Sequence, residues 1–136
     1  MVEPSGLDGR NVSTANDLTE FALSIKNSSI SSLSVSKTDK INGITIQNTN
    51  PLLNLPGWDF KLSKTGYISE SGGCLLAILT IQNKLYSIAI LGATNTTDRW
   101  KDLIEIRKKL NIPNDKFFEP SYAIKNNKKQ IKFKKR

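Results

Sequence analysis

Lys64, Thr65 and Gly66 are consecutive and together have the chemistry needed to hold an anion beside an extended backbone. Lys64 would supply a fixed cation for a carboxylate, and the Thr65 hydroxyl would donate a hydrogen bond to the same group. Gly66 carries no side chain, so a peptide would lie close against the strand edge there. The backbone N–H of Tyr67 would then serve as one donor to an oxyanion. The candidate substrate-binding residues are therefore Lys64, Thr65, Gly66 and Tyr67.

The residues around this motif predict the strands that would position it. Trp58–Leu62 alternates between apolar and polar side chains and leads directly into the motif, whereas Ser69–Gly73 has the composition of a turn. Cys74–Gln82 and Leu85–Leu91 then predict two strands joined by a tight turn at Asn83-Lys84. The motif is therefore expected at the end of a strand that enters an antiparallel hairpin.

Two helices are predicted to flank these strands. Ser13 or Thr14 would cap the first helix, and its apolar face would consist of Leu18, Phe21, Ala22 and Ile25. Thr96 or Thr97 would cap the second helix, whose apolar face would consist of Trp100, Leu103, Ile104, Arg107 and Leu110. Helices on either side of antiparallel strands predict the α+β fold class.

The segment Asn27–Asn50 is rich in Ser, Thr and Asn. Short alternations at Ile30–Val35 and Ile41–Ile46 predict weak strands or an extended loop, with Asn42-Gly43 as a hairpin turn. Asn48 and Asn50 are interpreted as loop or strand-edge residues and not as catalytic ones. Trp58 and Trp100 are interpreted as packing residues.

The composition of the 136 residues limits the chemistry further. The absence of histidine excludes Ser-His-Asp and Cys-His catalysis and His-based metal sites. No cofactor and no metal are expected. The single cysteine, Cys74, cannot form an internal disulfide and is interpreted as a small buried hydrophobe. The longest apolar run, Cys74–Leu79, is far shorter than the roughly 20 residues of a membrane-spanning helix.

The net charge of +8 is concentrated at one end of the chain. The last residues contain seven cations and no acid: Lys125, Lys128, Lys129, Lys132, Lys134, Lys135 and Arg136. The remainder is therefore close to neutral, and residues 113–136 are predicted to form a basic, disordered tail. Because Ile124, Ile131 and Phe133 alternate with the cations, the tail also admits binding to a membrane surface, and its charge admits binding to nucleic acid.

Beyond the motif, the sequence resembles the low-molecular-mass penicillin-binding proteins, and most closely their D-alanyl-D-alanine endopeptidase branch, the penicillin-binding protein 7 type. The resemblance covers roughly residues 2–110. It depends on five segments that occur in the family's order: Val2–Leu7, Asn11–Leu18, Asn48–Asn50, Leu62–Tyr67 and Gly73–Leu75.

This resemblance implies a β-lactamase/transpeptidase-like fold and a serine-type D-alanyl-D-alanine carboxypeptidase or endopeptidase. Such an enzyme cuts D-alanyl bonds of peptidoglycan in the periplasm through an acyl-serine intermediate, and β-lactams bind it. Lys64, Thr65 and Gly66 would lie on the strand that lines its active site. As written, however, the segment Met1–Ser5 shows no export signal and predicts a cytoplasmic protein.

The sequence departs from the family in its expected nucleophile. The family places Ser-x-x-Lys and then Ser-x-Asn upstream of the segment with which this chain begins. The one Ser-x-x-Lys here, Ser34-Val35-Ser36-Lys37, lies in a stretch predicted as a strand, where residues three apart point to opposite faces. We therefore assign no catalytic residue.

Residues 1–112 are expected to form the C-terminal part of a transpeptidase-like domain, without the helical segment that carries the nucleophile. Alone it would be inactive, and the missing segment or self-association would complete it. Two alternatives are a non-catalytic module that binds D-alanyl peptides through Lys64 and Thr65, and a protein that binds a membrane or nucleic acid through its tail.

Overall fold

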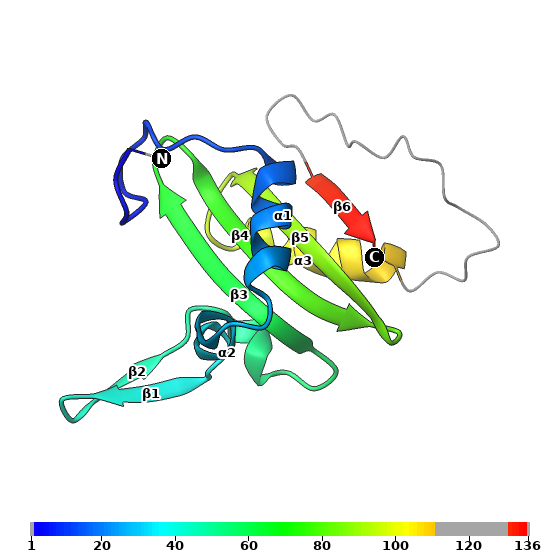
Figure 1. The fold of residues 1–136 in the computed structure, drawn as a ribbon, viewed down its shortest axis with the longest axis horizontal. Helices are drawn as coiled ribbons and strands as arrows, with labels where there is room; N and C mark the ends of the chain where they lie inside the picture. The colour runs from blue at the N-terminus through cyan, green and yellow to red at the C-terminus, as the bar shows by residue number, and fades with distance from the viewer. Residues whose placement is uncertain (1, 111–130, 136) are drawn as a thin grey trace.

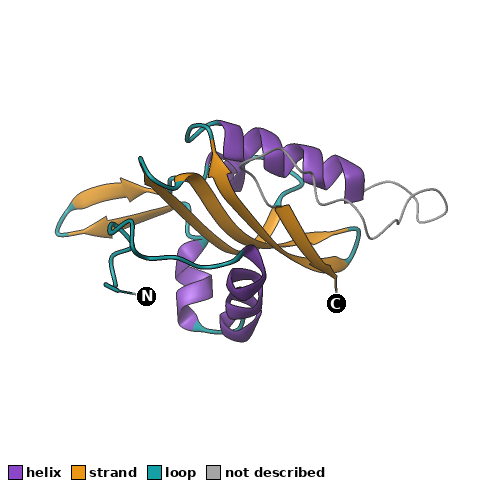
Figure 2. Cartoon of the chain, turned by 90° about the horizontal axis from the view of Figure 1, so that it is seen from above, coloured by secondary structure: helices purple, strands orange, loops and turns teal. Residues whose placement is uncertain are grey.

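The computed structural model describes residues 2–110 and 131–135, which form a four-stranded sheet covered by helices on both faces and a separate two-stranded hairpin (Figures 1 and 2). The sheet is antiparallel with the strand order β3-β4-β5-β6 and consists of β3 (Asp59–Ile68), β4 (Gly72–Ile81), β5 (Lys84–Ala93) and β6 (Ile131–Lys135). Helix α3 (Asp98–Leu110) covers one face, and α1 (Ala15–Ile25) and α2 (Ser29–Ser34) lie on the other (Figure 2). This arrangement confirms the predicted α+β fold.

The four candidate binding residues lie within β3, an edge strand of this sheet. The strand predicted at Trp58–Leu62 begins at Asp59 and continues through the motif to Ile68. Opposite it on β4, Thr65 pairs with Leu75 and Gly66 pairs with Cys74. Because β4 is the one strand paired with β3 among the described residues, the other edge of β3, here called its open edge, pairs with no described strand.

Two hairpin turns depend on left-handed backbone conformations. Asn42 and Gly43 have φ values of 51° and 80° and join β1 (Thr38–Ile41) to β2 (Ile44–Gln47), as predicted. The predicted hairpin of β4 and β5 is also confirmed, but its turn residues are Gln82 and Asn83, with φ values of 49° and 59°. The turn is one residue earlier than predicted because Lys84 already pairs with Ile81.

Both faces of the central strands are buried, so β4 and β5 are almost continuously apolar. On the face covered by α3, Leu103 and Ile106 join a core that includes Leu75, Ile88 and Ile90. On the other face, the smaller core contains Ala22, Leu23, Leu62 and Ile78. Trp58 and Trp100 pack against the larger core as partly buried residues, which confirms their interpretation as packing residues.

The predicted buried face of α1 was wrong in part. Thr14 caps the helix as expected, because its side chain accepts a hydrogen bond from the N–H of Asp17. The buried side chains are those of Ala15, Thr19, Ala22 and Leu23, whereas Phe21 is 56% exposed. Small side chains allow α1 to approach the sheet closely, and the Ser87 hydroxyl donates to the Thr19 carbonyl at 3.1 Å. The face of α1 that packs against the sheet is therefore determined by close packing of Ala15, Thr19 and Ala22, and Phe21 remains exposed.

The strand predicted at Ile30–Val35 was also wrong, because Ser29–Ser34 forms helix α2. Ser28 caps this helix by accepting from the N–H of Ser31, and the Ser31 hydroxyl donates to the Ile25 carbonyl at 2.6 Å. Serine side chains bonded to nearby backbone thus form a short helix where the pattern had indicated a strand.

At the start of α3, the accepting side chain is that of Asn95 and not of Thr96 or Thr97. Its Oδ1 atom accepts from the N–H groups of Thr97 and Asp98, at 2.8 and 2.9 Å. Leu103 is buried as predicted, together with Arg99 and Ile106, which the predicted face did not include.

Most of the predicted tail, residues 113–130 and 136, lies outside the described residues, so its disorder stays a prediction. Ile131–Lys135 differs from that prediction, because it forms β6 and pairs antiparallel with β5. The alternation of apolar and basic residues in this segment has the two-residue period of a strand.

Candidate functional site

The C-terminal half of β3 presents the predicted binding residues at different depths. Lys64 and Tyr67 are exposed, whereas Thr65 and Gly66 are half-buried. The Lys64 ammonium group donates to the Thr65 carbonyl and so lies folded back along its own strand. The structure therefore places all four residues on one strand, with a cation and an exposed aromatic ring on either side of a threonine and a glycine.

Gly66 is not required by the surrounding fold. A Cβ atom added to it would lie 3.7 Å from the Cβ atom of Cys74, which is an ordinary contact. Gly72 and Gly73 differ, because a Cβ atom at either position would lie 2.4 Å from a backbone carbonyl oxygen. Those two glycines are needed for packing, whereas the glycine at position 66 leaves space that the described chain does not use.

The Thr65 hydroxyl has a partner that the sequence analysis did not identify. The Oγ1 atoms of Thr65 and Thr49 lie 2.8 Å apart, and either of them can be the donor. Thr49 lies in the loop between β2 and η1 (Pro51–Asn54). The signal available in the sequence was the position of Thr49 between Asn48 and Asn50, two residues whose amides hold this loop in place.

Asn50 is fully buried and connects the loop to β3. Its Nδ2 atom donates to the Ser63 hydroxyl at 2.9 Å, and its Oδ1 atom accepts from the N–H of Leu52 at 2.9 Å. The interpretation of Asn50 as a loop residue is therefore confirmed, with the added finding that it caps η1.

Asn48 connects the same loop to the end of α2. Its Nδ2 atom donates to the carbonyls of Ser34 and Ser36, each at 3.0 Å. Its Oδ1 atom accepts from the N–H of Asn50 at 2.9 Å. Asn48 and Asn50 therefore fix the backbone on both sides of Thr49, which holds the Thr49 hydroxyl beside that of Thr65.

Ser34 is engaged in backbone hydrogen bonds and not with Lys37. It is the last residue of α2, and its hydroxyl donates to the Ser31 carbonyl at 2.7 Å. The same oxygen accepts from the N–H of Ser63 at 3.1 Å. The reason given from the sequence, a strand in which Ser34 and Lys37 face opposite sides, is therefore replaced: the Ser34 hydrogen is directed at a carbonyl within its own helix.

Arg99 of α3 is a buried cation that reaches the motif from the sheet face covered by α3, and the sequence analysis missed it. It is 7% exposed, and its Nη1 atom donates to the Gly66 carbonyl at 3.0 Å and to the Cys74 carbonyl at 3.4 Å. Its Nε atom has no hydrogen-bond partner, and the guanidinium carbon lies 4.8 Å from the centre of the Trp100 ring. Burial lowers the pKa of the guanidinium, which nevertheless stays protonated.

Cys74 lies directly opposite Gly66 and is half-buried, so it is less enclosed than the predicted buried hydrophobe. Its Sγ atom lies 3.7 Å from the Gly72 carbonyl oxygen and 3.8 Å from that of Ser71. These weak contacts direct the thiol toward the β3–β4 turn.

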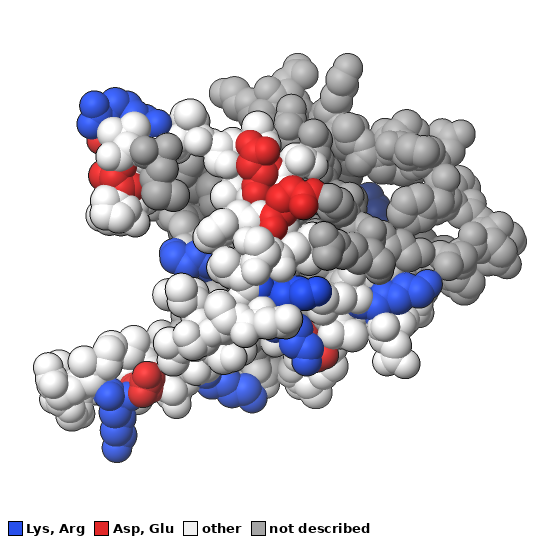
Figure 3. Space-filling view, in the orientation of Figure 1, with Lys and Arg blue, Asp and Glu red and all other residues white. Residues whose placement is uncertain are grey.

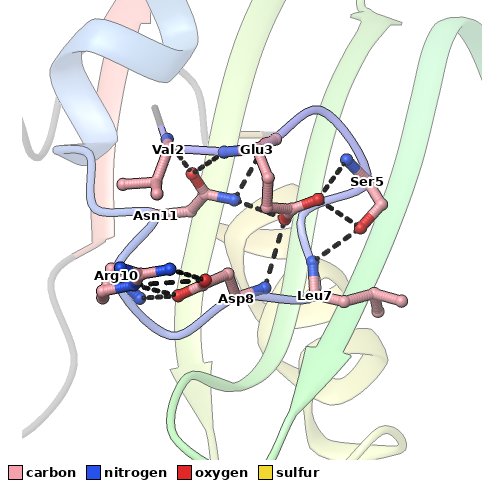
Figure 4. A network of polar contacts seen from close by, with 7 residues as sticks. All are labelled: Val2, Glu3, Ser5, Leu7, Asp8, Arg10 and Asn11. Carbon is pink, nitrogen blue, oxygen red and sulfur yellow. Dashed lines mark hydrogen bonds and ion pairs between the residues drawn. The ribbon is translucent and has the colours of Figure 1, made fainter.

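The loop before α1 is organised around one carboxylate (Figure 4). The Glu3 side chain accepts from the hydroxyl and the N–H of Ser5 at 2.5 and 2.7 Å, and from the N–H of Asp8 at 3.1 Å. The Asn11 amide also donates to it at 2.7 Å. The bonds from Ser5, above all the one from its hydroxyl, together with the one from the Asp8 N–H, lower the pKa of Glu3 to about 2. The carboxylate therefore holds the loop in a fixed shape at neutral pH.

This loop contacts the turn at the end of β3. A Cβ atom added to Gly9 would lie 3.3 Å from the Cγ atom of Glu70, which belongs to the β3–β4 turn. Residues 2–11 therefore lie beside the end of the strand that carries Tyr67.

The described residues contain no group of three side chains suited to hold a metal ion. None of the helices within residues 2–110 is long and apolar enough to cross a membrane. On the face shown in Figure 3, the described basic and acidic side chains are dispersed among uncharged ones, as expected for a nearly neutral body.

Comparison with known proteins identifies the family of this chain. The sequence profile of the D-alanyl-D-alanine carboxypeptidase family matches residues 1–95. A D-alanyl-D-alanine endopeptidase of Escherichia coli is 32% identical over 113 residues, which are 78% of this chain and 36% of that protein. One of Pseudomonas aeruginosa is 31% identical over 114 residues, 79% of this chain and 37% of that protein. The chain thus spans little more than a third of the length of these relatives. It belongs to the D-alanyl-D-alanine carboxypeptidase family.

Proposed function

We propose that β3 binds the D-alanyl end of a peptidoglycan peptide, as the substrate-binding strand of a D-alanyl-D-alanine peptidase. The observation that carries this proposal is the space at Gly66. A Cβ atom there would meet only one ordinary contact among the described residues, so their packing gives no reason for a glycine. An extended ligand that passes close to the backbone does give one.

Lys64 and Thr65 would bind the terminal carboxylate of that peptide. The Lys64 ammonium group, now folded back on the Thr65 carbonyl, is exposed and would turn outward to meet an anion. If Thr49 donates to Thr65, the Thr65 hydrogen remains available for the carboxylate. Thr49 would then orient the Thr65 hydroxyl so that its hydrogen points toward the ligand.

The open edge of β3 would pair with the backbone of the peptide. An unpaired strand edge offers a row of N–H and C=O groups to an extended chain, and pockets beside alternate residues then provide selectivity. At the end of this row, the N–H of Tyr67 would donate to the carbonyl oxygen of the scissile bond and stabilise its developing charge.

Cleavage of the bond requires an activated nucleophile in addition to this strand. The relatives named above are D-alanyl-D-alanine endopeptidases, and this chain spans about a third of their length. We therefore propose that the nucleophile comes from sequence outside this chain, and that the complete enzyme acts on peptidoglycan in the periplasm and binds β-lactams.

Two measurements test the proposal. In an NMR titration with an acetylated peptide ending in D-alanyl-D-alanine, the amide signals of residues 64–67 should shift, and the same peptide ending in L-alanyl-L-alanine should shift them less. Equal responses to the two peptides would contradict the proposed selectivity. After incubation of the chain with benzylpenicillin, the intact mass should stay unchanged. A stable adduct on Ser34 would show instead that the chain carries its own nucleophile.

A further inference from the structure

The buried guanidinium of Arg99 has an arrangement that fold stability alone does not explain. Burying a cation is costly unless a counter-charge and hydrogen bonds compensate for the lost water. Within the described part of the chain Arg99 makes no ion pair, its Nε atom has no partner, and its identified acceptors are two backbone carbonyls. An apolar side chain at this position would avoid that cost.

One of the two acceptors is the carbonyl in the middle of the candidate site. The Nη1 atom of Arg99 lies 3.0 Å from the Gly66 carbonyl oxygen on β3 and 3.4 Å from the Cys74 carbonyl oxygen on β4. Because one nitrogen reaches carbonyls of both strands, the Gly66 carbonyl points toward β4 and away from the open edge of the sheet.

The direction of this carbonyl determines the direction of the next N–H group. The peptide bond between Gly66 and Tyr67 is planar and trans, as the structure contains no cis peptide among the described residues. In a trans peptide the C=O and N–H groups point in opposite directions. With the Gly66 carbonyl held toward β4, the Tyr67 N–H must point toward the open edge of β3.

We propose that Arg99 is a positioning residue, which holds the Gly66–Tyr67 peptide so that the Tyr67 N–H faces the ligand. This inference rests on the proposed function of β3 as the peptide-binding strand. It adds a residue 33 positions away from Gly66 in sequence. A peptide next to glycine turns more easily than one between two larger residues, so Arg99 would add a restraint to the pairing of Gly66 with Cys74.

A purely structural role for Arg99 leads to a different expectation. If the guanidinium mainly held β3 and β4 together, its removal would lower the stability of the whole sheet. If it mainly orients one peptide, replacement by an apolar side chain should leave stability nearly unchanged or raise it, since no buried charge remains. A structural role therefore predicts lower stability after the substitution. A positioning role predicts weaker ligand binding with unchanged or higher stability.

The test compares Arg99→Met with Arg107→Met in the full chain. Arg107 is a matched control, because it also belongs to α3, also donates to a backbone carbonyl, that of Gly57 at 2.5 Å, and also stacks on a tryptophan. The N–H residual dipolar coupling of Tyr67 reports the direction of its bond, and an NMR titration reports affinity for the D-alanyl-D-alanine peptide. Thermal unfolding gives the stability of each variant.

For Arg99→Met we expect a changed Tyr67 coupling, unchanged couplings in the middle of β5, and affinity about three- to tenfold weaker, the loss of one hydrogen bond. Arg107→Met should leave the Tyr67 coupling and the affinity as in the wild type. An unchanged Tyr67 coupling in Arg99→Met would overturn the inference. So would unchanged affinity in a chain whose wild type binds the peptide.

The outcomes also separate this inference from the proposed function. If the wild-type chain does not bind the peptide, the proposed function fails, whereas the Tyr67 coupling still shows whether Arg99 orients the peptide bond. If Arg99→Met does not fold, Arg99→Lys takes its place, since it keeps the charge and one donor but not the planar guanidinium. The Tyr67 coupling and the peptide affinity of Arg99→Lys should lie between the wild-type values and those expected for Arg99→Met.

Discussion

The substitution Gly66→Ala separates the role of the motif in binding from its role in folding. The added Cβ atom would lie 3.7 Å from the Cβ atom of Cys74, and Gly66 does not have a positive φ. Alanine therefore fits the native backbone without strain. A glycine replaced by alanine at a compatible position typically stabilises a protein by about 0.4–1 kcal/mol, because the unfolded chain loses freedom.

The same methyl group would lie where we propose that the peptide passes. An extra methyl group in a closely packed contact costs about 1–3 kcal/mol, and each 1.4 kcal/mol is a tenfold change in Kd. We therefore expect Gly66→Ala to bind the D-alanyl-D-alanine peptide about 5- to 150-fold more weakly while unfolding at the same or a slightly higher temperature.

The assay is thermal unfolding followed by NMR titration, with Gly73→Ala as the control. At Gly73 the added Cβ atom would lie 2.4 Å from the Asn95 carbonyl oxygen, so this variant should be destabilised by about 1–3 kcal/mol. A Gly66→Ala chain that is clearly less stable, or that binds the peptide as tightly as the wild type, would refute the argument that the space at Gly66 serves a ligand.

Three further predictions follow from the polar contacts around the site. Asn50→Ala removes a buried amide with two hydrogen bonds and should lower the free energy of unfolding by about 1–3 kcal/mol in a thermal or urea experiment, whereas the exposed Asn54→Ala should change it little. Thr49→Val removes the partner of the Thr65 hydroxyl and should weaken peptide binding about three- to tenfold with little change in the unfolding temperature; unchanged affinity would exclude Thr49 from the site. The pKa of Glu3 is lowered from 4.5 to about 2, so its stabilisation of the loop is complete above pH 4.5 and is lost as the pH falls toward 2. The amide signals of the Glu3 loop should follow this range in an NMR titration, and Glu3→Gln should abolish the transition.

Several local elements could be predicted from the sequence because neighbouring residues determine them. The Asn42-Gly43 turn requires two positive φ values, which this pair adopts readily. The cap at Thr14 and the β4–β5 hairpin likewise depend on residues close together in the chain. For the same reason the motif at residues 64–67 could be placed on a strand, and its chemistry follows from the residue types alone.

Helix α2 and the buried face of α1 could not be predicted in this way. For α1, the apolar period was satisfied by Leu18 and Phe21, yet the helix turns Ala22 and Thr19 toward the sheet. How closely a helix approaches a sheet depends on the side chains of both, and the strand residue that bonds to Thr19, Ser87, lies 68 positions later.

The sequence by itself determined the strand that carries the motif and the type of each binding group. Only the tertiary structure decided which distant groups surround them. The Thr49 hydroxyl, in the loop between β2 and η1, lies beside the Thr65 hydroxyl, and Arg99 of α3 donates to the Gly66 carbonyl. Such contacts leave no periodic signal in the chain, because they depend on the packing of α3 against the sheet and on a loop held by two buried or half-buried amides. The chemistry of the site therefore depends on consecutive residues of β3, whereas the orientation of its groups depends on residues distant in the sequence.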